Sequence, residues 1–183
     1  VSDKNVIIGN DCLIESNVII HPNTIIGDNT IIRAGSIIGG NGFQFWKNSN
    51  EILTVEHFGK TRIGSNVEIK EFCSIHKAVF DWDSTVIKNN TKIDSHVHIG
   101  HGNKIGSNVY LCSHSNISGN SIIEDNCYIG PGVNIPNRIL IGSNSKISVG
   151  ATVTKNVVAR STVSGNFAIL HEKYLEHIKR ISS

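Results

Sequence analysis

An aliphatic side chain returns at every sixth position along most of this chain. Four positions after it stands a small or β-branched residue, and Gly, Asn, Asp and Ser fill the positions between. A period of six fits neither an α-helix nor an alternating strand, and it is typical of a parallel β-helix. The aliphatic positions are Ile8, Ile14, Ile20, Ile26, Ile32 and Ile38, and later Ile87, Ile93, Ile99, Ile105, Leu111, Ile117, Ile123, Ile129, Ile135, Ile141, Ile147 and Val153.

The period also predicts which side chains meet. One hexamer cannot bury its aliphatic side chain alone, whereas three hexamers close a triangular coil, and stacked coils share one core. Each coil adds the distance between hydrogen-bonded strands, about 4.8 Å. Residues three hexamers apart are therefore expected to lie one above the other on the same face.

The repeat predicts an all-β fold with a parallel β-helix over residues 1–165, organised as a single domain. Two loop insertions interrupt the helix, near 42–62 and 80–86. After the first insertion the aliphatic frame resumes at Ile63, shifted by one residue. Loops that interrupt a rigid scaffold are common places for function, so these insertions are the first places to look for a site.

The two ends of the chain differ from the repeat. Residues 166–183 predict a short C-terminal α-helix, because Leu170, Leu175 and Ile178 are spaced at helical intervals. We expect this helix to cap the coil or to pack on a neighbouring subunit. The repeat is already in phase at Val6, so we expect a further segment before residue 1.

The amino-acid composition limits the classes of function that this chain can have. The hydrophobic content of 39% follows from a coil that needs only about two inward residues in six. Basic and acidic residues are interspersed around a net charge of +2, which disfavours a nucleic-acid partner. No apolar run approaches the length of a membrane span. Three of the four cysteines fall on small inward positions with no metal-ligand spacing, which favours free thiols and a cytoplasmic location.

The histidines that are candidates for a chemical role lie in the middle coils. Eighteen-residue spacing places His101 over Asp83 and beneath Gly119. The carboxylate of Asp83 is expected to accept a proton from one imidazole nitrogen, which leaves the other nitrogen free to act as a base. Gly119 leaves room for a groove, and its backbone N–H is a candidate oxyanion donor. Further along the same column stand the predicted donor-binding residues Asn137, Arg138 and Lys155, whose basic groups suit phosphates.

The same spacing predicts two more pairs, His96 beneath His114 and His76 beneath Asp94. Aromatic residues gather in the insertions, where they suit a sugar ring, a base or an acyl chain. The alternative is that they only pack the loops onto the coil. The predicted acceptor-binding residues are Phe43, Phe45, Trp46, Trp82 and His76.

Several segments carry a resemblance to a known family. The repeats themselves resemble the hexapeptide-repeat acyltransferases, which implies that the β-helix is left-handed. The segments 38–45 (IGGNGFQF), 85–87 (TVI), 92–94 (KID) and 99–103 (IGHGN) are similar to the UDP-3-O-acylglucosamine N-acyltransferases and related nucleotide-amino-sugar N-acyltransferases. This resemblance implies that His101 is the catalytic base and Asp94 a further acidic residue of the site. It also implies a homotrimer with each active site between adjacent subunits. Two positions differ from the family, since Gly102 replaces an Asn and Arg138 stands near a second family histidine.

Together, these features predict transfer of an acyl group to the amine of a nucleotide-linked amino sugar, in surface glycan or lipopolysaccharide synthesis. The donor would be acetyl-CoA, another acyl-CoA or an acyl carrier protein, and no metal is required. Three alternatives remain: a sugar O-acetyltransferase, a metalloenzyme like the γ-type carbonic anhydrases, and a non-catalytic binding module. The metalloenzyme needs a third ligand beside His96 and His101, and the position two coils before His96 is read as Lys60.

Overall fold

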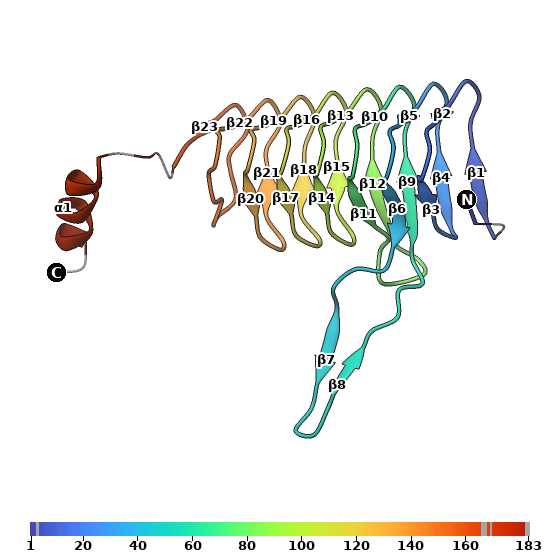
Figure 1. The fold of residues 1–183 in the computed structure, drawn as a ribbon, viewed down its shortest axis with the longest axis horizontal. Helices are drawn as coiled ribbons and strands as arrows, with labels where there is room; N and C mark the ends of the chain where they lie inside the picture. The colour runs from blue at the N-terminus through green and yellow to red at the C-terminus, as the bar shows by residue number, and fades with distance from the viewer. Residues whose placement is uncertain (3, 166–167, 169, 182–183) are drawn as a thin grey trace.

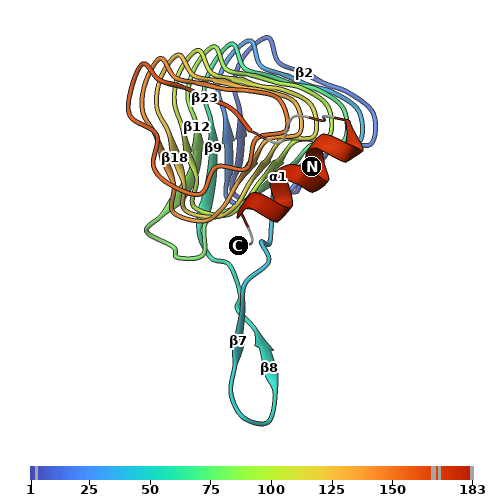
Figure 2. The same ribbon diagram turned by 90° about the vertical axis from the view of Figure 1, so that its left-hand side faces the viewer.

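The structure is a computed structural model that describes residues 1–2, 4–165, 168 and 170–181. Its body is a parallel β-helix in which three sheets form the sides of a triangular coil (Figures 1 and 2). The first sheet contains β1 (Val6–Ile8), β4 (Thr24–Ile26), β9 (Lys60–Ile63), β12 (Ser84–Ile87), β15 (Lys104–Ile105), β18 (Ile122–Ile123) and β21 (Leu140–Ile141).

The other two parallel sheets repeat this arrangement. The second sheet contains β2 (Leu13–Ile14), β5 (Ile31–Ile32), β10 (Glu68–Ile69), β13 (Lys92–Ile93), β16 (Tyr110–Leu111), β19 (Tyr128–Ile129), β22 (Lys146–Ile147) and β23 (Thr162–Val163). The third sheet contains β3 (Ile19–Ile20), β6 (Ile37–Gly40), β11 (Ser74–His76), β14 (His98–Ile99), β17 (Asn116–Ile117) and β20 (Asn134–Ile135).

The core is the column of aliphatic residues that the six-residue period predicts. Ile32, Ile69 and Ile99 are fully buried, and each such side chain contributes roughly 1.5–3 kcal/mol through burial. Many of the turns place a residue other than Gly in the left-handed backbone region. Asn holds most of these positions because its short amide tolerates that conformation. The inward aliphatic and the left-handed turn together explain why six residues form one side of the coil.

The register agrees with one sequence-based prediction and corrects another. Ile26 pairs with Ile63, which confirms the shift by one residue after the first insertion. The next coil is one hexamer longer than a regular coil, since Ile75 pairs with Ile99. The prediction that His76 lies beneath Asp94 was therefore wrong. The second insertion adds a whole hexamer, so it preserves the phase of the repeat while lengthening the coil.

Both insertions leave the coil at the same corner, where the third sheet passes into the first (Figure 2). The first insertion contains an antiparallel hairpin of β7 (Phe45–Lys47) and β8 (Ile52–Thr54), which projects away from the coil (Figure 1). The base of the hairpin is joined to the second insertion, because Phe58 N–H donates to Val79 O at 2.9 Å and Gly59 N–H to Ala78 O at 3.1 Å. The two loops thus support each other.

The C-terminal helix α1 (His171–Ile181) lies beyond the last coil (Figure 1). The ribbon of α1 stands clear of the stack, and Leu175 is exposed, so the described residues of α1 do not show the predicted capping contact. Among the described residues, no helix is both long and apolar enough to cross a bilayer.

Candidate active site

The histidines of the middle coils lie at or between two corners of the triangular coil, called here the insertion corner and the plain corner. The insertion corner comprises the turns from the third sheet to the first, residues 41–59, 77–83, 100–103 and 118–121. The plain corner comprises the turns from the second sheet to the third, residues 94–97 and 112–115 among them. Strand β14 runs between the two corners, so His96 precedes it at one and His101 follows it at the other.

Buried side chains fix the turn that presents His101. Asn103 occupies an inward position and is fully buried. Its Nδ2 donates to Gly100 O at 2.8 Å, and its Oδ1 accepts from Ser121 N–H at 2.8 Å. Gly102 has a positive φ of 71°, and its N–H donates to Thr85 Oγ1 at 2.8 Å. Because these groups are satisfied within the coil, the turn holds the Cα–Cβ bond of His101 in one direction.

His101 is partly buried in this corner. A Cβ at Gly119 would lie 2.7 Å from both Cε1 and Nε2 of the ring, so the imidazole packs directly on Gly119. The Nδ1 atom is buried and has no hydrogen-bond partner among the described residues. Burial lowers the pKa of His101, nearby His57 lowers it further, and Asp83 acts in the opposite direction. The ring is therefore neutral near pH 7, as a general base requires.

The exposed edge of His101 opens into a hollow of about 210 Å³. The walls come from the first insertion, from β11, from β14 and its flanking turn, and from the next two coils. The lining residues are Phe43, Gln44, His76, His98, Gly100, His101, Ser118, Gly119 and Asn137.

Two further histidines of this hollow are also held neutral. His76 and His98 contact each other edge to face, with ring centroids 4.8 Å apart, and Ser74 Oγ lies 3.0 Å from His76 Nε2. Burial lowers the pKa of His76 to about 4, and the neighbouring histidines add to the effect. Burial likewise lowers the pKa of His98. The pocket therefore presents neutral nitrogen donors and acceptors rather than a cluster of cations at pH 7.

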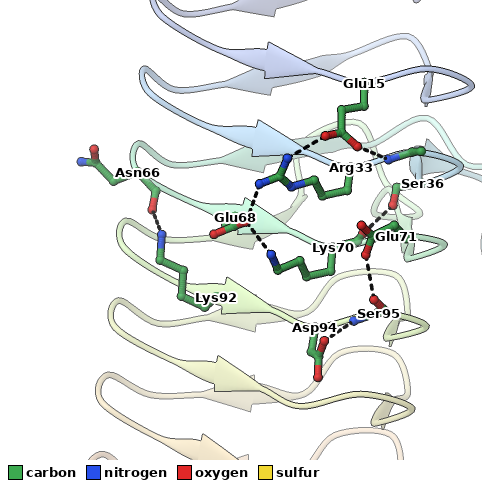
Figure 3. A network of polar contacts seen from close by, with 11 residues as sticks. Glu15, Arg33, Ser36, Asn66, Glu68, Lys70, Glu71, Lys92, Asp94 and Ser95 are labelled. Carbon is green, nitrogen blue, oxygen red and sulfur yellow. Dashed lines mark hydrogen bonds and ion pairs between the residues drawn. The ribbon is translucent and has the colours of Figure 1, made fainter.

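The two predicted carboxylates do not hydrogen bond to His101. Asp83 Oδ1 accepts from Lys104 Nζ at 2.6 Å and from Ser84 N–H at 2.7 Å. Asp94 lies at the plain corner, where its carboxylate accepts from Ser95 N–H at 2.8 Å (Figure 3). Asp83 thus acts on His101 only through its charge, and Asp94 belongs to a different corner.

Of the other predicted site residues, the structure brings four to the pocket. Phe43, His76, Gly119 and Asn137 line it together with His101. The remaining ones lie outside its lining. Phe45 and Trp46 are on the projecting hairpin, and Trp82 stacks on Phe80 with ring centroids 4.7 Å apart. Arg138 and Lys155 are exposed on later coils.

Sequence reasoning did not select His57, His98, Gln44 or Ser118 as site residues. His98 and Ser118 occupy regular coil positions, so the correct register could have placed them beside His76 and Gly119. His57 and Gln44 lie in the first insertion, where no period indicates which way a side chain points. His57 is nevertheless buried, and its ring centroid lies 5.6 Å from that of His101.

The histidines required for a zinc site of the carbonic anhydrase kind do not converge. His96 stacks between Phe72 and His114 at the plain corner, with ring centroids at 5.3 and 4.9 Å, so the predicted pair of His96 and His114 is confirmed. Phe72 occupies the coil directly before His96, and Lys60 pairs with Ser84 in the first sheet instead. The reading of Lys60 two coils before His96 was therefore wrong.

Comparisons with known proteins agree with the repeat. The model of the family described as bacterial transferase hexapeptide (six repeats) matches residues 5–40 and 120–155. A UDP-3-O-acylglucosamine N-acyltransferase from Helicobacter pylori is 42% identical over 69 residues, which are 37% of this chain and 20% of that protein. A protein of the same name from Campylobacter jejuni is 41% identical over 69 residues. These matches span about a fifth of the length of the curated relatives.

Solved structures show the likeness over nearly the whole chain. The UDP-N-acetylglucosamine acyltransferase from Francisella novicida superposes with a TM-score of 0.81 at 28% identity, over 95% of this chain and 63% of that chain. The enzyme of that name from Campylobacter jejuni superposes with a TM-score of 0.71 at 21% identity, over 88% of this chain and 68% of that chain. The left-handed parallel β-helix and the resemblance to hexapeptide-repeat acyltransferases are thereby confirmed.

Proposed function

We propose that this chain transfers an acyl group from a thioester to the amine of a nucleotide-linked amino sugar, with His101 as the general base. The observation that carries the proposal is the environment of His101, a neutral imidazole that packs on Gly119 and opens into a pocket. Similarity to acyltransferases that act on UDP-linked glucosamines supports the class of substrate.

The proposed reaction needs one base and one oxyanion donor. The amine nitrogen attacks the thioester carbonyl carbon while Nε2 of His101 takes a proton from that nitrogen, directly or from the tetrahedral intermediate. The C–S bond then breaks, and the same proton passes to the departing thiolate. The N–H of Gly119 makes no hydrogen bond among the described residues, and Gly119 packs against the His101 ring, so we assign this N–H to the developing oxyanion.

The acceptor and donor are proposed to occupy opposite sides of His101. Phe43 and His76 border the pocket on the side of the insertions and suit the acceptor sugar. Asn137 borders it on the side of the later coils. We assign the phosphates of an acyl-CoA or acyl carrier protein to Arg138 and Lys155, which are exposed on the later coils.

We also propose a homotrimer, with the open face of the pocket completed by an adjacent subunit. The proposal follows the resemblance to the acyltransferases, and light scattering from purified protein tests it. The expected mass is three times the 19.9 kDa of one chain. A monomer at micromolar concentration would contradict it.

The activity is tested by a matrix of donors and acceptors. Acetyl-CoA, longer acyl-CoAs and acyl carrier proteins are combined with UDP- and TDP-linked amino sugars, and free thiol is measured. The expected result is thiol release that requires both a donor and an amino sugar. Donor-independent or acceptor-independent signals, or equal turnover by the H101A variant, would contradict the assignment.

A second candidate is transfer to a sugar hydroxyl. The superposed enzyme from Francisella novicida is named for UDP-N-acetylglucosamine, a sugar whose nitrogen is already acetylated. A sugar of that kind offers only hydroxyl groups, which need a general base more than an amine does. Including UDP-N-acetylglucosamine in the matrix separates the two reactions, since only O-transfer consumes it.

A further inference from the structure

The tautomer of His57 is fixed by its own loop. The Nδ1 atom of His57 lies 2.9 Å from Val55 O, and a carbonyl oxygen only accepts hydrogen bonds. In the neutral ring the proton therefore sits on Nδ1, and Nε2 carries a bare lone pair. The side chain is only 2% exposed although it comes from an insertion. The first insertion thus buries a hydrogen-bond acceptor beside the active site.

Two neighbouring rings each have a buried nitrogen without a hydrogen-bond partner among the described residues. Neither Nε2 of His57 nor Nδ1 of His101 makes a hydrogen bond among the described residues. The two rings meet edge to face, with centroids 5.6 Å apart and planes at 78°. Buried polar atoms are nearly always paired, so one acceptor and one potential donor on adjacent rings are candidates to pair with each other.

Gly42 lies between these two rings and shows how they pair. A Cβ at Gly42 would lie 3.0 Å from His57 Nε2 and 3.1 Å from His101 Cδ2. A half-turn of the His101 ring exchanges Cδ2 with Nδ1, and hydrogen bonding selects between these two orientations of nearly equal shape. The turn brings Nδ1 to the side of His57. It also exchanges Cε1 with Nε2, which are equally close to an added Cβ at Gly119, so Nε2 keeps its place beside Gly119.

We propose that His57 is a positioning residue, whose Nε2 accepts a hydrogen bond from Nδ1–H of His101, directly or through one water. This proposal rests on the proposed role of His101 as a base. The hydrogen bond holds His101 in the tautomer whose Nε2 is unprotonated, and it faces the imidazolium with a lone pair once the proton has been taken. Asp83 makes no hydrogen bond to His101, and its Oδ1 accepts from Lys104 and Ser84.

The kinetic test compares three single variants. H57L keeps much of the volume but removes the acceptor, whereas H57Q places an amide oxygen near the position of Nε2. H114L makes the same change of residue type at the plain corner. We expect H57L to lower kcat by about 10- to 100-fold with little change in KM. H57Q is expected to stay within about fivefold of the parent, and H114L to match it.

A spectroscopic test reads the tautomer without turnover. Nitrogen NMR of ¹⁵N-histidine protein, assigned with H101A and H57L, is expected to show His101 protonated at Nδ1 in the parent and in H57Q. In H57L the two tautomers of His101 are expected to mix. Parent-like kcat and an unchanged His101 spectrum in H57L would overturn the proposal, and so would equal loss of activity in H57L and H57Q with that spectrum unchanged. Turnover by H101A would instead overturn the proposed function and leave the tautomer result standing.

Discussion

The two ends of β14 carry histidines in opposite environments. At the plain corner His96 is exposed, has a left-handed backbone with a φ of 60°, and stacks with Phe72 and His114. At the insertion corner His101 is partly buried, has a lowered pKa and borders a pocket. Both lie in one ten-residue stretch of regular coil. The residue type and the repeat are shared, so the difference between the corners comes from what surrounds them.

The insertions supply that difference. Both leave the coil at the insertion corner, and they cover His101 with the loop that contains Gly42 and His57. Among the described residues no such loop covers the plain corner, where His96 and His114 are exposed. The added loop buries His101 and brings His57 beside it, and both effects lower the pKa of His101.

Replacing a histidine by alanine should affect activity far more at the insertion corner than at the plain corner, and this is the largest difference we expect. H101A removes the base and is expected to lower kcat by roughly 100- to 10,000-fold, whereas H114A stays close to the parent. Both variants should melt at nearly the parent temperature, since neither side chain belongs to the core. Steady-state thiol release and thermal unfolding measure the two quantities. A similar loss of activity in H114A would remove the distinction between the corners.

A second comparison of the two corners uses substitutions of one glycine at each, Gly119 and Gly132. A Cβ at Gly119 would lie 2.7 Å from the His101 ring, so G119A is expected to displace the imidazole and lower kcat by about 100-fold. Gly132 lies at the plain corner, where an added Cβ meets only Gly150 Cα at 3.9 Å. G132N suits its positive φ of 66° and should keep full activity. Parent-like turnover in G119A would show that the ring does not need its place against Gly119.

A third comparison uses one inward-facing residue at each corner, Asn103 at the insertion corner and Val97 at the plain corner. Asn103 supports the turn of His101, and N103V leaves Gly100 O and Ser121 N–H without partners, at a cost of about 2 kcal/mol. V97A trims a buried side chain at the plain corner and is expected to cost a comparable amount. Urea unfolding should show similar losses of stability, while only N103V loses kcat below its unfolding transition. Equal activity in the two variants would mean that Asn103 serves the fold alone.

Much of the fold could be predicted from the six-residue period of the sequence. The shift at Ile63 could be predicted because a single extra residue breaks the six-residue phase. The longer coil before Ile99 could not, because the second insertion adds a whole hexamer and leaves the phase intact. Eighteen-residue stacking therefore holds within regular coils and fails across that loop.

In the candidate site too, residues in regular coils could be predicted from the period, whereas residues in the loops could not. His101, Gly119 and Asn137 lie in regular coils, so stacking predicted that they line one column, and the pocket contains all three. The pairing of His101 with Asp83 could not be judged from stacking, because Lys104 and Ser84 compete for the carboxylate. His57 had no signal, since the direction of a loop side chain depends on contacts that no period encodes.

The smallest expected effect is on the pH dependence of stability, and it concerns His76. Its pKa is lowered from 6.5 in the unfolded chain to about 4 in the folded protein. Between these values the unfolded chain binds a proton that the folded protein does not, so this contribution to stability is complete above pH 6.5 and is lost as the pH falls towards 4. H76Q removes the proton-binding group from both states. The free energy of unfolding, measured with urea at several pH values, should therefore decrease less steeply below pH 6.5 in H76Q than in the parent. Above pH 6.5 its dependence on pH should differ least between the two proteins. An unchanged slope would mean that His76 takes up its proton at the same pH in both states, and that the insertion corner does not shield it.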